Sequence, residues 1–153
     1  MILAGIFILS ACQSKMLTYG DRTVDLDRRI ALEDGGPHKA NWQTKDLTLD
    51  YEYTRKGNAL DISGDIHLNR AKKKTLVKFS FAINLLDPSG KVLQTQSLTV
   101  TGGRRKVKTI SFEKDMEIPA DTRYIAFSYG GSVSGTGEGG STKIFGELPK
   151  LMF

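Results

Sequence analysis

The sequence predicts an all-β fold, an antiparallel β-sandwich of about seven strands with an immunoglobulin-like architecture. Three observations lead to this prediction. Apolar and polar residues alternate from residue 46 onward, turn-forming residues recur at nearly regular spacing, and residues 46–129 contain no helical period of about 3.6 residues. The 153-residue chain is about one domain long, and its 39% hydrophobic and 25% charged residues are the balance of a globular protein.

The alternation defines each strand in turn. Residues 46–53 and 60–68 form the first two strands, and Gly64 on the apolar face of the second predicts a bulge or a close backbone approach. Residues 77–85 give the clearest strand, and residues 92–100 return as its partner. Further strands are expected at residues 110–112, 124–129 and 143–148.

Turn residues separate these strands. Residues 55–58, Arg-Lys-Gly-Asn, form the first turn. In residues 87–90, Asp-Pro-Ser-Gly, proline presets the backbone at the second position and glycine closes the fourth, which is typical of a type I turn. Gly102 and Gly103 are expected to turn the chain again.

The segment before residue 46 is predicted to be a polar tether. Residues 34–41, DGGPHKAN, are rich in turn formers and favour irregular structure, which places His38 in flexible chain. The tether is expected to become partly ordered near Trp42, which we interpret as a packing anchor beside the first strand.

The N-terminus begins with the apolar run ILAGIFIL at residues 2–9. A membrane-spanning helix needs about 20 such residues, so this run is too short to cross a bilayer. It has the length of a signal-peptide core, which is roughly 7–15 residues. The polar residues Gln13, Ser14 and Lys15 follow abruptly after the only cysteine of the chain, Cys12.

Leu9, Ser10, Ala11 and Cys12 match the lipobox of bacterial lipoproteins at each position. This resemblance implies that Cys12 is linked to diacylglycerol through a thioether, becomes the mature N-terminus and is acylated there. Cysteine suits this chemistry because its thiolate is a strong nucleophile, and more than one acyl chain is needed for stable anchoring. The segment before the run departs from the pattern because it carries no Lys or Arg. The alternative is a buried N-terminal strand with an inert cysteine.

The resemblance implies three regions: a signal peptide at 1–11, a lipidated N-terminus and partly ordered tether at 12–45, and the β-sandwich at 46–153. It also implies a bacterial cell-envelope location with palmitate-type acylation. Gln13, in place of the aspartate that retains such proteins in the inner membrane, favours the outer membrane facing the periplasm.

Residues 60–96, LDISGDIHLNRAKKKTLVKFSFAINLLDPSGKVLQTQ, resemble the FxLYD-type sandwich domains of bacterial envelope proteins. The shared features are a strand, a basic turn, and a second strand that ends in an aliphatic residue followed by the Asp-x-x-Gly-Lys-Val turn. The resemblance implies a fold and no activity.

The titratable residues do not indicate catalysis. One cysteine excludes an internal disulfide and a cysteine-based metal site. The two histidines lie apart: His38 is in the tether, and His67 is expected on the solvent side of its strand or paired across it. The sequence therefore predicts a protein that is not an enzyme, with no metal and no cofactor.

Two basic turns are candidate contacts for an anionic surface. The chain carries 22 Lys and Arg against 17 Asp and Glu, a net charge of +5. In an up-and-down chain the two turns should lie at one end of the sandwich, where the tether is also expected to arrive. They would then face lipid headgroups or cell-wall polymer. The same turns also fit solubilising segments that guard strand edges. The eight cations are Arg70, Lys72, Lys73, Lys74, Arg104, Arg105, Lys106 and Lys108.

The glycine-rich residues 130–142 form a candidate ligand loop, and the alternative is a mobile surface loop. The backbone and hydroxyl groups of this loop suit contact with sugar or peptide. Its candidate ligand residues are Tyr129, Ser132, Ser134, Thr136 and Glu138.

Two functions follow from these features. The first is a lipid-anchored, non-catalytic binding or scaffolding domain whose partner is another envelope protein or a cell-wall component, with no role for nucleic acid. The alternative is a small-ligand or glycan-binding module that uses the glycine-rich loop. An exposed, unpaired apolar strand edge would favour the first function, and a shallow aromatic groove beside that loop would favour the second.

Overall fold

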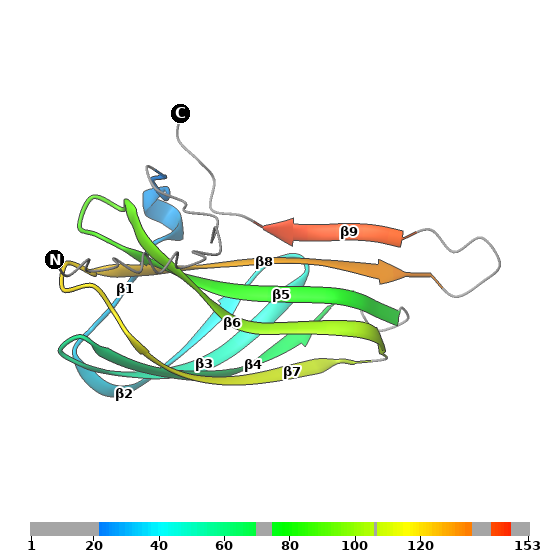
Figure 1. The fold of residues 1–153 in the computed structure, drawn as a ribbon, viewed down its shortest axis with the longest axis horizontal. Helices are drawn as coiled ribbons and strands as arrows, with labels where there is room; N and C mark the ends of the chain where they lie inside the picture. Colours follow the sequence, from blue (N-terminus) through cyan, green and yellow to red (C-terminus); the bar gives the residue numbers. More distant parts are fainter. Residues whose placement is uncertain (1–21, 70–74, 106, 136–141, 148–153) are drawn as a thin grey trace, which may run out of the picture.

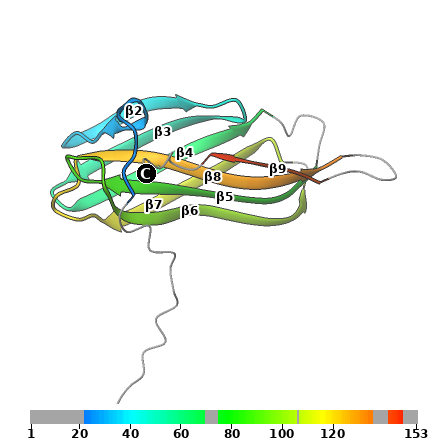
Figure 2. The ribbon, with the colours of Figure 1, turned by 90° about the horizontal axis from the view of Figure 1, so that it is seen from above.

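The protein is an antiparallel β-sandwich, as predicted. A computed structural model describes residues 22–69, 75–105, 107–135 and 142–147. One sheet has the strand order β1-β8-β5-β6, with β9 also paired to β8, and the other has the order β2-β3-β4-β7 (Figure 1). Seen from above, the strands of both sheets run along the long axis of the molecule (Figure 2).

A 3-10 helix at Leu26–Arg28 precedes the strands, and among the residues that the structure describes every strand pair is antiparallel. Within the described residues no helix is long and apolar enough to cross a membrane. The strands are β1 (Ile30–Ala31), β2 (Gly35–Gln43), β3 (Leu47–Lys56), β4 (Ala59–Leu68), β5 (Thr75–Leu86), β6 (Val92–Arg105), β7 (Thr109–Glu117), β8 (Tyr124–Ser134) and β9 (Thr142–Glu147).

The seven predicted strands correspond to β3 through β9. In β3 the buried positions alternate with more exposed ones along the whole strand, because one side faces the core and the other faces solvent. The turn at residues 87–90 also forms as predicted. The N–H of Gly90 donates to the carbonyl of Asp87 at 3.0 Å, and Gly90 has a φ of 87°, which favours glycine.

The prediction of irregular structure at residues 34–41 is wrong, because β2 covers most of this segment and pairs with β3 from His38 to Gln43. The folded domain therefore begins before residue 46, and His38 lies in a strand. An edge strand tolerates Pro37 because one side of its backbone has no ladder partner to lose. Pairing with β3 then outweighs the local preference for turns.

The turn expected at Gly102 and Gly103 is also displaced. Both glycines lie inside β6, which continues to Arg105, and the chain reverses between Arg105 and Thr109. Gly103 has a φ of 89°, so it bends the strand without ending it.

Aromatic rings from both sheets meet in the core. Trp42 on β2 lies 5.4 Å from Phe127 and 6.2 Å from Phe81 between ring centroids, which confirms its role as a packing anchor.

Gly64 lies at a close backbone approach, as the sequence predicts. A Cβ there would lie 2.7 Å from the carbonyl oxygen of Asp50 and 3.1 Å from the ring of Phe112.

Candidate functional site

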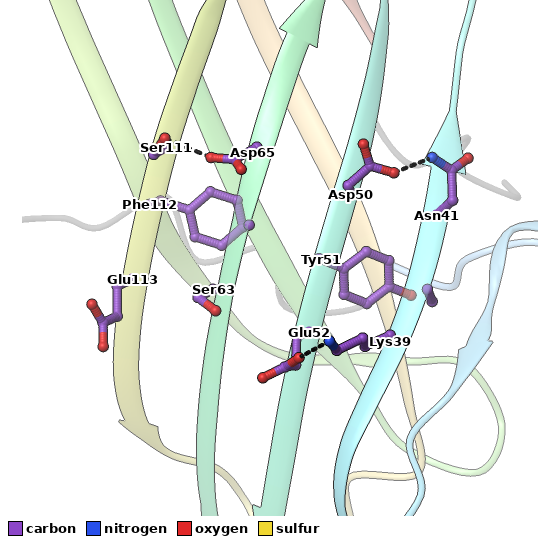
Figure 3. A pocket seen from close by; sticks show the side chains of 12 residues that line it. Lys39, Asn41, Asp50, Tyr51, Glu52, Ser63, Asp65, Ser111, Phe112 and Glu113 are labelled. Carbon is purple, nitrogen blue, oxygen red and sulfur yellow. Dashed lines mark hydrogen bonds and ion pairs between the residues drawn. The ribbon is translucent and has the colours of Figure 1, made fainter.

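The outer face of the β2-β3-β4-β7 sheet carries an open hollow of about 1010 Å³ (Figure 3). We call it the acidic hollow. Its floor is the backbone of the row Ala40–Tyr51–Gly64–Phe112, which by alternation directs its side chains to the opposite face of the sheet, and Ser63 adds only a small side chain. Larger polar side chains rise around the floor, and most of them are carboxylates. They are Lys39, Asn41, Asp50, Glu52, Asp65 and Glu113.

The strand register arranges these side chains in rows across the sheet. Residues two apart on one strand face the same side and lie about 7 Å apart, so each row stands one such step from the next. A smaller hollow beside the first extends the surface to a third row. The three rows are Asn41–Asp50–Asp65–Ser111, Lys39–Glu52–Ser63–Glu113, and Thr54–Asp61–Asp115.

Hydrogen bonds and ion pairs hold part of the first two rows. Asn41 Nδ2 donates to Asp50 Oδ1 at 2.7 Å, and Ser111 Oγ donates to Asp65 Oδ1 at 2.5 Å. Lys39 Nζ lies 3.3 Å from Glu52 Oε2. These contacts are visible as dashed lines in Figure 3. They fix the orientation of the carboxylates and leave oxygen atoms on each facing solvent.

The carboxylates toward the β7 edge have no such partners. Within the described residues, no ion pair or side-chain hydrogen bond engages Asp61, Glu113, Asp115 or Glu117. Asp61 lies directly opposite Asp115 in the register, and all four of these residues are exposed. Like charges directly opposite each other destabilise a sheet, so this pairing costs stability. These exposed carboxylates concentrate negative charge on one face of the sheet, although the net charge of the chain is +5.

His67 borders the same face and behaves as predicted. Its Nδ1 lies 3.1 Å from Thr109 Oγ1, and its Nε2 lies 3.4 Å from Asp50 Oδ2. It is thus paired across strands on the solvent side. Among the described residues, no group of three or more His, Cys, Asp or Glu side chains is placed to hold a metal ion.

The structure describes only part of the candidate ligand loop, and it contradicts the prediction for one residue, Tyr129. Tyr129 is 3% exposed, and its hydroxyl donates to Asp46 Oδ2 at 2.8 Å inside the molecule. The prediction that Tyr129 contacts a ligand is therefore wrong, because the alternation of β8 turns its ring into the core. Ser132 and Ser134 are half-buried near the end of β8, and Thr136 and Glu138 lie outside the described residues.

The flanks of the two basic turns do lie at one end of the sandwich. Leu76 pairs with Arg105, and the N–H of Leu68 donates to the carbonyl of Lys108. Lys108 is exposed. For Arg104 and Arg105 the structure describes the backbone alone, and Arg70, Lys72, Lys73, Lys74 and Lys106 lie outside the described residues.

The chain enters the domain at the opposite end, so the expectation that the tether arrives beside the basic turns is wrong. Thr23 pairs with Lys91, and the N–H of Val24 donates to the carbonyl of Gly90 at 2.9 Å. The reason is β2, which adds one antiparallel strand before β3 and so reverses the direction of entry. Arg29 Nε also donates to Val24 O at 2.7 Å, and its guanidinium lies against Gly90 in the β5–β6 turn.

Sequence reasoning missed the acidic hollow. The signal was present in the polar positions of β3, β4 and β7, where acidic residues recur at the period of two. Finding it required the register between strands, which sets Asp50 beside Asp65 and Asp61 beside Asp115.

Comparison with known proteins gave no match among family models, curated proteins or solved structures. Cys12 and the rest of the lipobox lie outside the described residues.

Proposed function

We propose that this chain is a lipid-anchored, non-catalytic binding protein of the bacterial cell envelope, and that it binds a positively charged segment of another envelope component at the acidic hollow. The lipobox at residues 9–12 supports the anchor, and Gln13 favours the outer membrane. The similarity of residues 60–96 to FxLYD-type envelope domains is in keeping with this location.

The way the chain enters the domain supports a tethered role. Val24 is fully buried in a small cluster with Leu86, Val92 and Ala126. A force applied to the N-terminus would therefore act on the folded sandwich, because Val24 is packed into it. At roughly 3.6 Å per extended residue, the chain from Cys12 to Arg22 reaches at most about 36 Å, which keeps the domain close to the membrane surface.

The observation that carries the binding proposal is the charge of the sheet face. Each of the three rows holds two carboxylates, in the pairs Asp50 and Asp65, Glu52 and Glu113, and Asp61 and Asp115. The spacing of about 7 Å between rows equals the spacing of alternate side chains in an extended peptide. A segment with Lys or Arg at every second position would therefore meet one row with each cation, and long-range attraction would speed its approach.

Two experiments test the two parts separately. Metabolic labelling with palmitate should mark the wild-type chain and leave a Cys12→Ser variant unlabelled. Equal labelling of both chains would contradict the anchor.

Binding is tested with the detergent-solubilised full chain and a fluorescent peptide of alternating Lys and Thr. Replacing Asp61 and Asp115 together by Asn should lower its affinity about fivefold, since each exposed charge pair contributes roughly 0.5 kcal/mol. The matched control replaces Asp27 and Asp121, which are exposed elsewhere, by Asn. The same loss in both double variants would refute binding at the acidic sheet face that the three rows form.

A further inference from the structure

Strand β6 forms an open edge of the five-stranded sheet. It pairs with β5 along its length, and among the described residues no strand pairs with its other side. Every second N–H and C=O group along such an edge points away from the sheet and can pair with another extended chain.

Charge and proline, two of the features that usually block such pairing, are absent from most of the β6 edge. Residues 92–103, VLQTQSLTVTGG, contain no charged residue and no proline. Two apolar side chains of the strand face solvent, since Val100 is 65% exposed and Leu93 is 39% exposed. An exposed, uncharged edge strand is a site of association.

The edges of the other sheet are guarded by contrast. On β7, Lys114 lies in register with the core residue Ile62, yet its side chain is exposed, and Glu113 and Asp115 flank it. Charged residues at an edge, and inward positions occupied by charge, prevent strand addition. On β2 the backbone is interrupted at its start by Gly36 and Pro37. The chain thus protects the β7 and β2 edges and leaves β6 open.

The open edge has two stretches in unbroken register with β5, residues 94–97 and residues 99–102, and the second holds the exposed Val100. The register with β5 shifts between Phe81 and Ala82, so Leu98 is an extra residue at a bulge. Beyond the bulge, residues 99–102 pair with 78–81 in unbroken register. Val100 lies within this stretch, with Thr99 and Thr101 on either side.

We propose that β6 pairs with β6 of a second copy of this chain, antiparallel and centred on Val100, to give a two-fold dimer. The two-fold axis places Val100 opposite Val100 and Thr99 opposite Thr101, and cross-strand pairs of β-branched residues and of threonines stabilise antiparallel sheets. Because residues 97–103, which pair with one another around this centre, carry no charge, two chains of net charge +5 meet there without direct repulsion. This proposal does not depend on the acidic hollow, which lies on the other sheet.

The centre of symmetry gives a crosslinking test that reads the register. Residues directly opposite in an antiparallel pair have Cα atoms about 4.5–5.5 Å apart, within the range of a disulfide, whereas diagonal neighbours are about 7–8 Å apart. In a Cys12→Ser background, Val100→Cys should form a covalent dimer on mild oxidation with copper phenanthroline. Thr101→Cys, which faces Thr99 of the second copy, should not. No dimer from Val100→Cys, or equal dimer from both variants, overturns the proposal.

Sedimentation of the detergent-solubilised full chain tests the same contact without oxidation. Val100→Lys should weaken dimerisation about tenfold or more, which corresponds to about 1.4 kcal/mol. The matched control is Leu26→Lys, which also replaces an exposed apolar residue (77% exposed) and adds the same charge. A wild-type chain that stays monomeric at all concentrations overturns the proposal, as does equal weakening by both variants. If the Cys12→Ser variant loses palmitate labelling and still dimerises, the β6 contact is independent of the lipid anchor.

Discussion

Replacing Tyr129 by Phe removes one hydroxyl from a buried polar network that joins the two sheets. The hydroxyl donates to Asp46 Oδ2 at 2.8 Å and lies 2.9 Å from Thr44 Oγ1. Because the single phenolic proton points to Asp46, the hydroxyl of Thr44 donates to Tyr129. Thr44 Oγ1 in turn accepts from the N–H groups of Asp46 and Leu47, both at 3.2 Å. The network thus ties β8 to the turn between β2 and β3.

The expected loss follows from these contacts. Phe keeps the ring packing against Trp42 and removes the hydrogen bonds alone, so the change isolates the polar term. A hydrogen bond to a charged group contributes about 1.5–3 kcal/mol, and Asp46, which is 1% exposed, cannot turn to water. We expect a loss of about 2–3 kcal/mol. For a folded body of roughly 130 residues this corresponds to about 7–11 °C in Tm.

Urea unfolding followed by the fluorescence of the single tryptophan measures this loss. The midpoint should fall with an unchanged slope, because the surface exposed on unfolding stays the same. Tyr124→Phe is the matched control. Its hydroxyl makes no hydrogen bond within the described residues, so the change should cost less than about 0.5 kcal/mol. A Tyr129→Phe protein as stable as this control would refute the reasoning.

Three further predictions concern single residues. Gly64→Ala should destabilise the domain by about 1–3 kcal/mol in urea unfolding, because the new Cβ meets the ring of Phe112 at 3.1 Å and backbone at 2.7 Å; unchanged stability would contradict the close approach. Burial raises the pKa of Tyr51 to about 12, so its phenol should titrate late by absorbance, and a Tyr51→Phe protein should lack that late step. Since the raised pKa favours the neutral form in the fold, this residue's contribution to stability is present below pH 10 and is lost as the pH rises from about 10 to about 12. A hydrogen bond from the hydroxyl of Ser89 is the main cause that lowers the pKa of Asp87 below 3.8. The contribution of Asp87 to stability is therefore present above pH 3.8 and is lost as the pH falls through the lowered pKa. An Asp87→Asn protein should consequently show a smaller fall in Tm on acidification than the wild type.

The sequence allowed the strands from residue 46 onward to be predicted because their alternation is regular and their turns are marked by glycine and proline. Residues 34–41 were predicted wrongly for a physical reason. Gly35, Gly36 and Pro37 disfavour a strand locally, and only pairing of the following residues with β3 makes β2 form. This single added strand also reverses the end at which the chain enters.

The candidate site was less predictable than the fold. The alternation of apolar and polar residues is visible in the sequence, and it is consistent with the exposed positions of Asp50 and Asp61. It does not show which strands are neighbours, and the charge of the face depends on β7 lying beside β4. The burial of Tyr129 was open to prediction, because its position in β8 has the parity of the core residues Ile125 and Phe127.

The two proposals fit one arrangement at a membrane. Antiparallel pairing of β6 with β6 sets the two-fold axis perpendicular to the sheets, so both acidic faces of the dimer point to the same side. The two entry points then lie at opposite ends of the dimer. Chains of at most about 36 Å from Cys12 to Arg22 reach one membrane from both ends when the strands lie parallel to its surface. Anionic headgroups repel the acidic faces, which favours the orientation with both hollows turned away from the lipid and toward a cationic partner.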